Sequence, residues 1–391
     1  MSKRYLTAES VCAGHPDKLC DIIADSVLEA CLSKDKNSRV ACEVLATKGK
    51  IIVAGEISCN ENINIKDIVK SVLIKVGYDP LEFEIDVNIQ KQSVDIAAGV
   101  NNALEVRNGV DEEYSSIGAG DQGTMYGYAT TETKEMLPLP LVLSHRIVKR
   151  LDKVRKENIV KGILPDGKAQ VTIEYENDKP VRVKTIVISV QHEKDKTHDE
   201  LFDDILTHVL WKCFEDFQFD LGTEIFINPS GKFTIGGPAA DTGLTGRKLM
   251  VDTYGGLTSH GGGALSGKDP TKVDRSGAYM ARYIAKHIVA CEFAQKCEVS
   301  VSYAIGKANP VAFSVDTFGT GLVSDDILSE AAQEVFNLRP AAIIDKLNLL
   351  NVKYSNTATY GHFSDSVSPW EAVNRCSDFR KAVEKYANRE D

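Results

Sequence analysis

Several familiar sequence signals are missing from this chain. Its nine cysteines include no CxxC motif, and no cysteine and histidine pairs stand at zinc-ligand spacing. No uninterrupted apolar run is long enough to span a bilayer, and the opening residues MSKRYLTAES contain no apolar signal segment. We therefore expect a cytoplasmic protein that does not enter a membrane and whose cysteines are reduced and buried.

A surplus of positive charge is also missing. Lys and Arg number 46 against 56 Asp and Glu, which gives a net charge of −10. Nucleic-acid binding needs a basic face that meets the phosphates, so nucleic acid is not expected as a partner. With 43 % hydrophobic residues in 391, the chain can bury a large core and suggests two or three domains. A local basic pocket is still compatible with an acidic whole.

No nucleophile arrangement is visible either. The serines and cysteines have no neighbouring histidine and acid at a telling spacing, although a triad assembled only in space would leave no such mark. Glycines, lysines, arginines and aspartates accumulate instead. Such residues position and neutralise a polyphosphate rather than attack a substrate covalently.

One pattern of elements occurs three times. A helix, two strands and a second helix are predicted at 16–32, 41–46, 50–58 and 65–77, then at 140–154, 170–176, 181–191 and 199–214, then at 276–294, 298–306, 309–319 and 325–337. The units are roughly 120–140 residues apart, far longer than a solenoid repeat. We predict an α+β fold of three similar domains, each a sheet covered by helices. A chance succession of similar elements is the alternative.

The predicted domains are 1–91, 118–231 and 232–391. The segment 92–117 between the first two has weak periodicity and many acidic and small residues. That composition fits a mobile loop, such as a lid over a site, and fits a plain linker equally well.

The segment GGALSGKD, residues 262–269, has the glycine and lysine spacing of a P-loop. Its last residue, Asp269, stands where the Mg²⁺-binding hydroxyl should be, and Pro270 separates it from a helix expected near Ser276. A strand is predicted before it, at 249–256. We expect a phosphate-holding glycine loop of another kind, supported by nearby cations, and a solvated surface loop is the alternative. These cations are Arg247, Lys248, Lys268, Lys272 and Arg275.

The second candidate is GHPDK, residues 14–18. Pro16 suits the first position of a helix, so His15 would lie at the positive end of the helix dipole, facing an anion. Asp17 and Asp21 share a helix face and could form half of a Mg²⁺ site. Helix capping for Asp17 and an ordinary polar contact for His15 are the alternatives.

Three further features are weaker. GAGDQG at 118–123 reads as a tight turn, and GGPAADTGLTGRK at 236–248 is a loop that ends on two cations. Glu43 and Glu56 lie in adjacent strands, where they would meet either a substrate ammonium group or a surface cation.

Taken together and in this order, these motifs resemble those of the S-adenosylmethionine synthetase (methionine adenosyltransferase) family, from TAES near the start to YGHF near the end. The resemblance implies pseudo-threefold symmetry of the three domains and active sites between the subunits of a dimer, often within a dimer of dimers (a homotetramer). It implies that methionine sulfur attacks C5′ of ATP, and that the released triphosphate is hydrolysed to phosphate and diphosphate. Two Mg²⁺ and K⁺ are the implied cofactors.

The resemblance also assigns roles to residues. Those implied in catalysis are His15, Lys168, Arg247 and Lys268. Those implied in ATP binding are His15, Asp166, Gly167, Lys168, Lys232, Phe233, Asp241, Arg247, Lys248, Ala264 and Lys268. Those implied in methionine binding are Glu56, Gln92, Asp241 and Lys272. Those implied in metal binding are Asp17 and Asp274 for Mg²⁺ and Glu43 for K⁺. The segment 92–117 resembles the gating loop of the family.

The chain departs from the family pattern at four positions. Val94 and Ala98 replace the more usual Pro and Gln in the gating segment, Ala13 replaces a usual Glu, and Ala240 replaces a usual Gly. Two other classes of function compete with the resemblance. A P-loop-like kinase would produce ADP, and Asp269 argues against it. A non-catalytic nucleotide-binding protein would not need the charged residues that this chain has.

Overall fold

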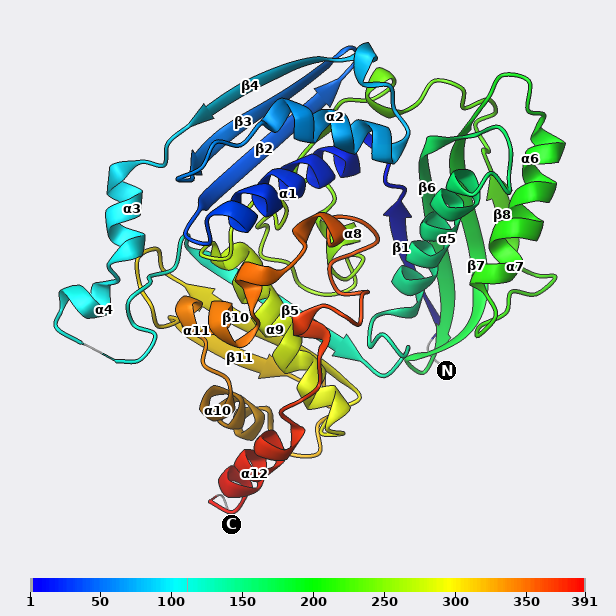
Figure 1. Cartoon of the computed structure of the whole chain (residues 1–391). Helices are drawn as coiled ribbons and strands as arrows, with labels where there is room; N and C mark the ends of the chain where they lie inside the picture. Colours follow the sequence, from blue (N-terminus) through cyan, green and yellow to red (C-terminus); the bar gives the residue numbers. More distant parts are fainter. Residues whose placement is uncertain (1–2, 111, 390–391) are drawn as a thin grey trace.

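The computed structural model describes residues 3–110 and 112–389, without the side chains of residues 94–97. In these residues the strands form three sheets, and one long helix packs on each (Figure 1). The α+β class is confirmed. No helix in this part of the chain combines the length and apolar content that crossing a membrane requires.

The first sheet has the strand order β4-β3-β2-β9. Its strands are β2 (Arg39–Thr47), β3 (Lys50–Ser58), β4 (Glu84–Gln90) and β9 (Gly243–Leu244). The helices α1 (Pro16–Lys34) and α2 (Ile65–Val76) cover one face. Alternate residues of β2, such as Val40 and Val44, are buried on that face, so Glu43 points to the other face and is exposed.

The second sheet has the order β1-β6-β7-β8. Its strands are β1 (Lys3–Val11), β6 (Ile163–Glu176), β7 (Lys179–His192) and β8 (Glu224–Ile227). It packs against α5 (Leu139–Lys156), and against α6 (His198–Ile205), which continues through a π-helical turn (Leu206–Leu210) into α7 (Trp211–Cys213). These elements share a hydrophobic core of their own.

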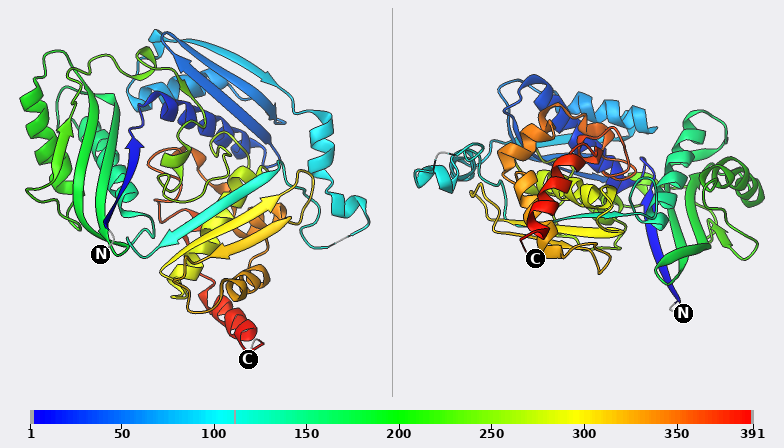
Figure 2. Two further views of the ribbon diagram at one scale, coloured as in Figure 1. Left: turned by 180° about the vertical axis from the view of Figure 1, so that it is seen from behind. Right: turned by 90° about the horizontal axis from the view of Figure 1, so that it is seen from below.

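The third sheet has the order β11-β10-β5, which Figure 2 shows from behind. Its strands are β5 (Gly123–Thr130), β10 (Lys296–Tyr303) and β11 (Ala312–Asp316). The helix α9 (Val273–Ala290) packs on it, and α10 (Asp325–Val335), α11 (Pro340–Lys346) and α12 (Cys376–Ala387) lie beyond. One continuous core joins the first and third sheets.

The twelve predicted helices and strands of the repeat are confirmed, with shifted ends. Other expectations were wrong. Residues 249–256 hold no strand but the short helix α8 (Leu249–Asp252), and α9 begins at Val273 rather than Ser276. The segment 92–117 was expected as a gating loop or a linker and contains two helices, α3 (Val94–Asn101) and α4 (Leu104–Arg107); its role stays a prediction. Short 3₁₀ helices lie at Pro80–Glu82, Gly237–Ala239, Leu349–Asn351, Tyr354–Asn356 and Pro369–Glu371.

The sheets do not follow chain order. β1 comes from the first residues of the chain but pairs antiparallel with β6, and β5 pairs with β10 across more than a hundred residues. The repeated pattern of the sequence predicted neither strand. The sheets therefore combine strands from different predicted domains: β1 of segment 1–91 joins the sheet of segment 118–231, and β5 of that segment joins the sheet of 232–391. The predicted boundaries 1–91, 118–231 and 232–391 remain a proposal.

Two cysteines are paired. Cys291, directly after α9, forms a disulfide with Cys376, the first residue of α12. The expectation of nine reduced thiols is wrong for this pair. The other seven cysteines are free, and all but the half-buried Cys59 are buried.

Candidate active site

The start of α1 is built to face an anion. His15 caps the helix, and its Nδ1 accepts a hydrogen bond from the backbone N–H of Asp17 at 3.2 Å. Pro16 occupies the first helical position, as predicted. The preceding Gly14 packs so closely on Pro165 that a Cβ atom would lie 2.4 Å from its Cβ. The first turn of α1 is thereby fixed against β6 of the second sheet.

Cations from the 243–248 loop reach this helix start. Lys248 Nζ donates to Asp17 Oδ2 at 2.6 Å, and Arg247 Nη1 lies 3.8 Å from Asp17 Oδ1. The backbone N–H of Leu244 also donates to Asp17 Oδ1, at 3.0 Å. Burial alone would raise the pKa of Asp17, but the hydrogen bonds from Lys248 and Leu244 lower it overall. Asp17 is therefore a carboxylate surrounded by donors.

His15 is neutral in this setting. Burial, together with the positive charges of Lys248 and Lys168, lowers the pKa of His15 to about 3. Lys168 projects from the exposed face of β6, opposite Val11 in the register with β1. A neutral imidazole among lysines adds a polar group at the helix start without adding repulsion.

Asp166 and Gly167 continue the same edge of β6. Asp166 Oδ2 accepts from the Gly237 N–H at 2.8 Å, while its Oδ1 is buried and has no partner among the described residues. Burial raises the pKa of Asp166 to about 6, with Gly237 and Lys168 opposing the rise and Asp241 adding to it. A buried oxygen without a partner calls for a water or a ligand donor.

The glycine segment 261–269 ends on β2. The Asp269 N–H donates to the Val40 carbonyl at 3.0 Å, and the Asp269 carboxylate accepts from the Val40 N–H at 2.7 Å and from the Thr271 hydroxyl at 2.6 Å. Asp269 also pairs with Lys272. The acid that replaces the P-loop hydroxyl is therefore buried and anchors the loop instead of facing phosphate.

Lys268 emerges beside this anchor. Its Nζ donates to Asp274 Oδ2 at 2.7 Å, in the first turn of α9, and its side chain is 19 % exposed. Partial burial raises the pKa of Glu43, and the positive charge of Lys268 opposes that rise. Glu43 and Glu56 both point to the uncovered face of the first sheet; both side chains reach solvent there, although surrounding protein atoms displace enough water around Glu43 to raise its pKa.

The structure thus brings His15, Asp17, Lys168, Arg247 and Lys248 together, and separately Lys268, Asp274 and Glu43. The glycine segment runs between the two groups. A Cβ atom on Gly246 would lie 2.6 Å from the Cβ of Ala264, and one on Gly263 would lie 2.1 Å from Asp274 Oδ1.

The other predicted site residues lie further out. Lys272 is held by Asp269. The backbone N–H of Gln92 donates to the Ser58 hydroxyl at 3.3 Å, at the end of β3. Lys232 and Phe233 follow β8, where the Phe233 N–H donates to His192 Nε2 at 3.2 Å. Among the described residues, neither Lys232 nor Phe233 forms a hydrogen bond or an ion pair with the helix start.

The sequence did not indicate the partners of two of these residues. Both oxygens of Asp21 are engaged inside the fold: its Oδ1 accepts from the Gly246 N–H at 2.9 Å and its Oδ2 from Lys18 Nζ at 2.7 Å. Burial raises its pKa to about 7, with Lys18 opposing the rise. Arg275, expected among the cations of the glycine loop, is fully buried and pairs with Asp25. The sequence offered one hint: Asp17, Asp21 and Asp25 are four residues apart on α1, which places them on one face of the helix.

Asp17 and Asp274 fit a magnesium role, since carboxylate oxygens are the ligands that Mg²⁺ prefers. The described residues contain no group of three or more His, Cys, Asp or Glu able to hold a metal on their own. Mg²⁺ typically binds one or two carboxylates and completes its shell with water and substrate phosphates. Each of the two acids forms an ion pair with a lysine, Asp17 with Lys248 and Asp274 with Lys268.

Comparison with known proteins identifies the family of the chain. Three family models match: the S-adenosylmethionine synthetase N-terminal domain over residues 3–101, the central domain over 116–233 and the C-terminal domain over 235–372. An S-adenosylmethionine synthase of Finegoldia magna is 48 % identical over 390 residues, covering 97 % of this chain and all of the relative. The chain belongs to the S-adenosylmethionine synthetase family.

Proposed function

We propose that the chain makes S-adenosylmethionine from ATP and L-methionine. The methionine sulfur attacks C5′ of ATP, the C5′–O bond breaks, and the triphosphate leaves with its electron pair. Water then hydrolyses the triphosphate to phosphate and diphosphate. A neutral thioether is a modest nucleophile, so the site must stabilise the negative charge that grows on the leaving group.

The observation that carries the proposal is the cluster at the start of α1. Arg247 and Lys248 lie beside Asp17 there, and the positive charge of Lys168 acts on His15. The free N–H groups of the helix point the same way. Lys268 and Asp274 form a second such unit of lysine and acid. We assign the cations to the triphosphate, Asp17 and Asp274 to two Mg²⁺ ions, and Glu43 to K⁺. The ions would add positive charge near the phosphate oxygens.

The remaining assignments concern the rest of both substrates. We assign Asp166, Gly167, Lys232, Phe233, Asp241 and Ala264 to ATP, and Glu56, Gln92, Asp241 and Lys272 to methionine. The unpartnered Asp166 Oδ1 supports its place, because a nucleotide hydroxyl or amino group could donate to it. The segment 92–117, with α3 and α4, is proposed to gate the site.

We further propose a homo-oligomer, a dimer or a dimer of dimers, with sites between subunits. Glu43 and Glu56 lie on the sheet face opposite α1 and α2, where a second copy could cover them. Pseudo-threefold symmetry and a cytoplasmic location belong to the same proposal. The recurring helix on each sheet supports the first, and the seven free cysteines support the second.

Product analysis tests the reaction. The protein is incubated with ATP, methionine, Mg²⁺ and K⁺, and the products are separated by chromatography. We expect S-adenosylmethionine, phosphate and diphosphate in equal amounts. ADP as the product would indicate a kinase, and unchanged ATP would indicate a protein that only binds nucleotide; either result would reject the proposal.

A further inference from the structure

A buried ion pair lies directly behind the glycine segment. Asp25 of α1 and Arg275 of α9 are both fully buried. Arg275 Nη1 donates to Asp25 Oδ1 at 2.7 Å and Nη2 donates to Asp25 Oδ2 at 2.8 Å, a two-pronged contact. The guanidinium also lies 4.2 Å from the ring centre of Tyr354. The pair therefore joins two helices that belong to different sheets.

The same pair holds the backbone of the glycine segment from two sides. The Gly267 N–H donates to Asp25 Oδ1 at 2.8 Å, and Arg275 Nη1 donates to the Lys268 carbonyl at 3.1 Å. The Cys42 N–H donates to the Gly267 carbonyl at 2.9 Å. Gly267 has a φ of +82°, and a Cβ atom there would lie 2.1 Å from the Cys42 oxygen. This position therefore requires glycine, and its peptide groups are held by three different elements.

The consequence falls on Lys268. Its backbone is fixed by Asp25 and Arg275, while its side chain is partly exposed and reaches Asp274 one residue before Arg275. The Asp25–Arg275 pair thus fixes both the origin of the Lys268 side chain and the helix turn that carries its partner. A displacement of about 1 Å in a positioning group can cost roughly a hundredfold in rate.

We propose that Asp25 and Arg275 are positioning residues that act on the reaction through Lys268. The inference rests on the proposed function, in which Lys268 contacts the triphosphate. A buried ion pair is weak evidence for stability, because well-packed apolar residues often stabilise a fold equally well. What this pair supplies, and apolar residues could not, is a donor and an acceptor for the Gly267 and Lys268 backbone.

The same helix offers a matched control. Arg282, two turns further along α9, is also fully buried, and it contacts Glu371 at 2.8 Å through both Nε and Nη2. Its remaining hydrogen bonds go to the carbonyls of Tyr128, Glu135 and Met136. None of these residues is among the predicted site residues.

The test compares Asp25→Asn, Glu371→Gln, Lys268→Ala and the double variant Asp25→Asn/Lys268→Ala. Single-turnover rates with radiolabelled methionine and ATP are measured below each melting temperature, together with KM for both substrates. We expect Asp25→Asn to lower the rate roughly a hundredfold with little change in KM for methionine. In the Lys268→Ala background the same change should cost less than about twofold, because coupled residues are not additive. Glu371→Gln should leave the rate within about twofold.

The outcomes separate the two claims. If Asp25→Asn costs as much with Lys268 absent as with it present, or if Glu371→Gln slows the reaction equally, the positioning role is wrong. If Lys268→Ala itself turns over normally, the proposed role of Lys268 fails instead. Arg275→Lys serves as a second variant should Asp25→Asn not fold, since lysine keeps the charge but cannot bridge both Asp25 oxygens and the Lys268 carbonyl. It is expected to show the same loss and the same dependence on Lys268.

Discussion

The two ends of α9 contain similar chemistry and serve different purposes. At its start, Arg275 pairs with Asp25, and Asp274 pairs with the partly exposed Lys268. Toward its end, Arg282 and Lys286 both pair with Glu371. The charges at the start fix the glycine segment, from which Lys268 reaches the surface. The charges further along bond to one another and to the backbone carbonyls of Tyr128, Glu135 and Met136. A buried charge pair alone therefore does not indicate a functional site. What matters is which backbone groups the pair also binds, and whether those groups belong to the site.

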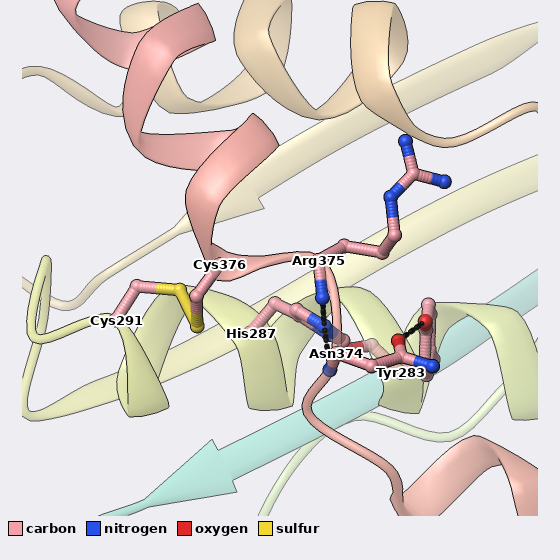
Figure 3. The surroundings of a disulfide bond; sticks show 6 residues. All are labelled: Tyr283, His287, Cys291, Asn374, Arg375 and Cys376. Carbon is pink, nitrogen blue, oxygen red and sulfur yellow. Dashed lines mark hydrogen bonds between the residues drawn. A yellow bond between two sulfur atoms is a disulfide. The ribbon is translucent and has the colours of Figure 1, made fainter.

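The far end of α9 is anchored in a third way (Figure 3). His287 Nδ1 lies 2.8 Å from the Tyr283 carbonyl, and its Nε2 accepts from the N–H groups of Asn374 and Arg375 at 3.2 and 3.1 Å. Because a carbonyl only accepts, Nδ1 must carry the proton and Nε2 must be free of one. The Cys291–Cys376 disulfide lies one turn beyond. This end attaches α12 to the fold and presents no predicted site residue.

The largest expected effect is at the start of the helix. Lys268→Ala should lower kcat by about a hundredfold to a thousandfold, because one charge-stabilising contact to a leaving group is removed. The fold should persist, since the side chain is partly exposed. Circular dichroism and a steady-state assay check both points. Near-normal turnover in a folded variant would remove Lys268 from the site.

Breaking the disulfide should lower stability and leave turnover unchanged, the reverse of the effect expected for Lys268→Ala. The double variant Cys291→Ala/Cys376→Ala opens a loop of 85 residues and should lower the free energy of unfolding by about 2–4 kcal/mol. The kcat below the melting temperature should not change. Urea denaturation and the standard assay measure the two quantities, and the wild type treated with a reductant is the control. A matching loss of kcat would show that both ends of α9 act on the site.

A smaller effect is expected for Asp274→Asn in the first turn of α9. The change should raise the Mg²⁺ concentration needed for half-maximal activity about tenfold or more, and added Mg²⁺ should restore part of the rate. Titration of activity with Mg²⁺ measures this shift. Glu371→Gln, at the other end, should leave the titration unchanged. An unaltered Mg²⁺ dependence in Asp274→Asn would argue against the metal assignment.

The smallest expected effect is the pH response of His287. Burial lowers its pKa, the hydrogen bond to the Tyr283 carbonyl opposes this, and the charges of Arg375 and Lys286 lower it further. The unfolded chain therefore binds a proton near pH 6.5 that the folded chain does not, and stability falls as the pH drops below that value.

The slope from this one group is at most about 1.4 kcal/mol per pH unit. Urea denaturation at pH 7 and pH 5.5 measures it, with His287→Gln as the comparison. If the variant loses as much stability over this range as the wild type does, His287 is not responsible.

Much of this fold could be predicted because its signals are local. The alternation of β2 and the apolar spacing of α9 are readable within a few turns of chain. The strands β1 and β5 were not predicted, because their partners, β6 and β10, lie far along the chain and leave no local signal beside them. The four apolar and acidic residues of α8 were mistaken for a strand because so short a run has no decisive period.

The site shows the same division. The motifs around His15 and Lys268 could be recognised from their glycines and charges. In the structure each motif contributes to a lysine–aspartate ion pair, Lys248 with Asp17 and Lys268 with Asp274. The acids of α1 repeat every four residues, which predicts a shared face. What Asp21 and Asp25 hold could not be predicted, because Gly246 and Gly267 are more than two hundred residues away.

A crystal structure with Mg²⁺ and a non-hydrolysable ATP analogue would show directly where the triphosphate binds. We expect the phosphates to lie against His15, Lys248 and Lys268, with the Gly267 N–H still bonded to Asp25. Phosphates bound elsewhere, with both lysines still paired to Asp17 and Asp274, would contradict this expectation.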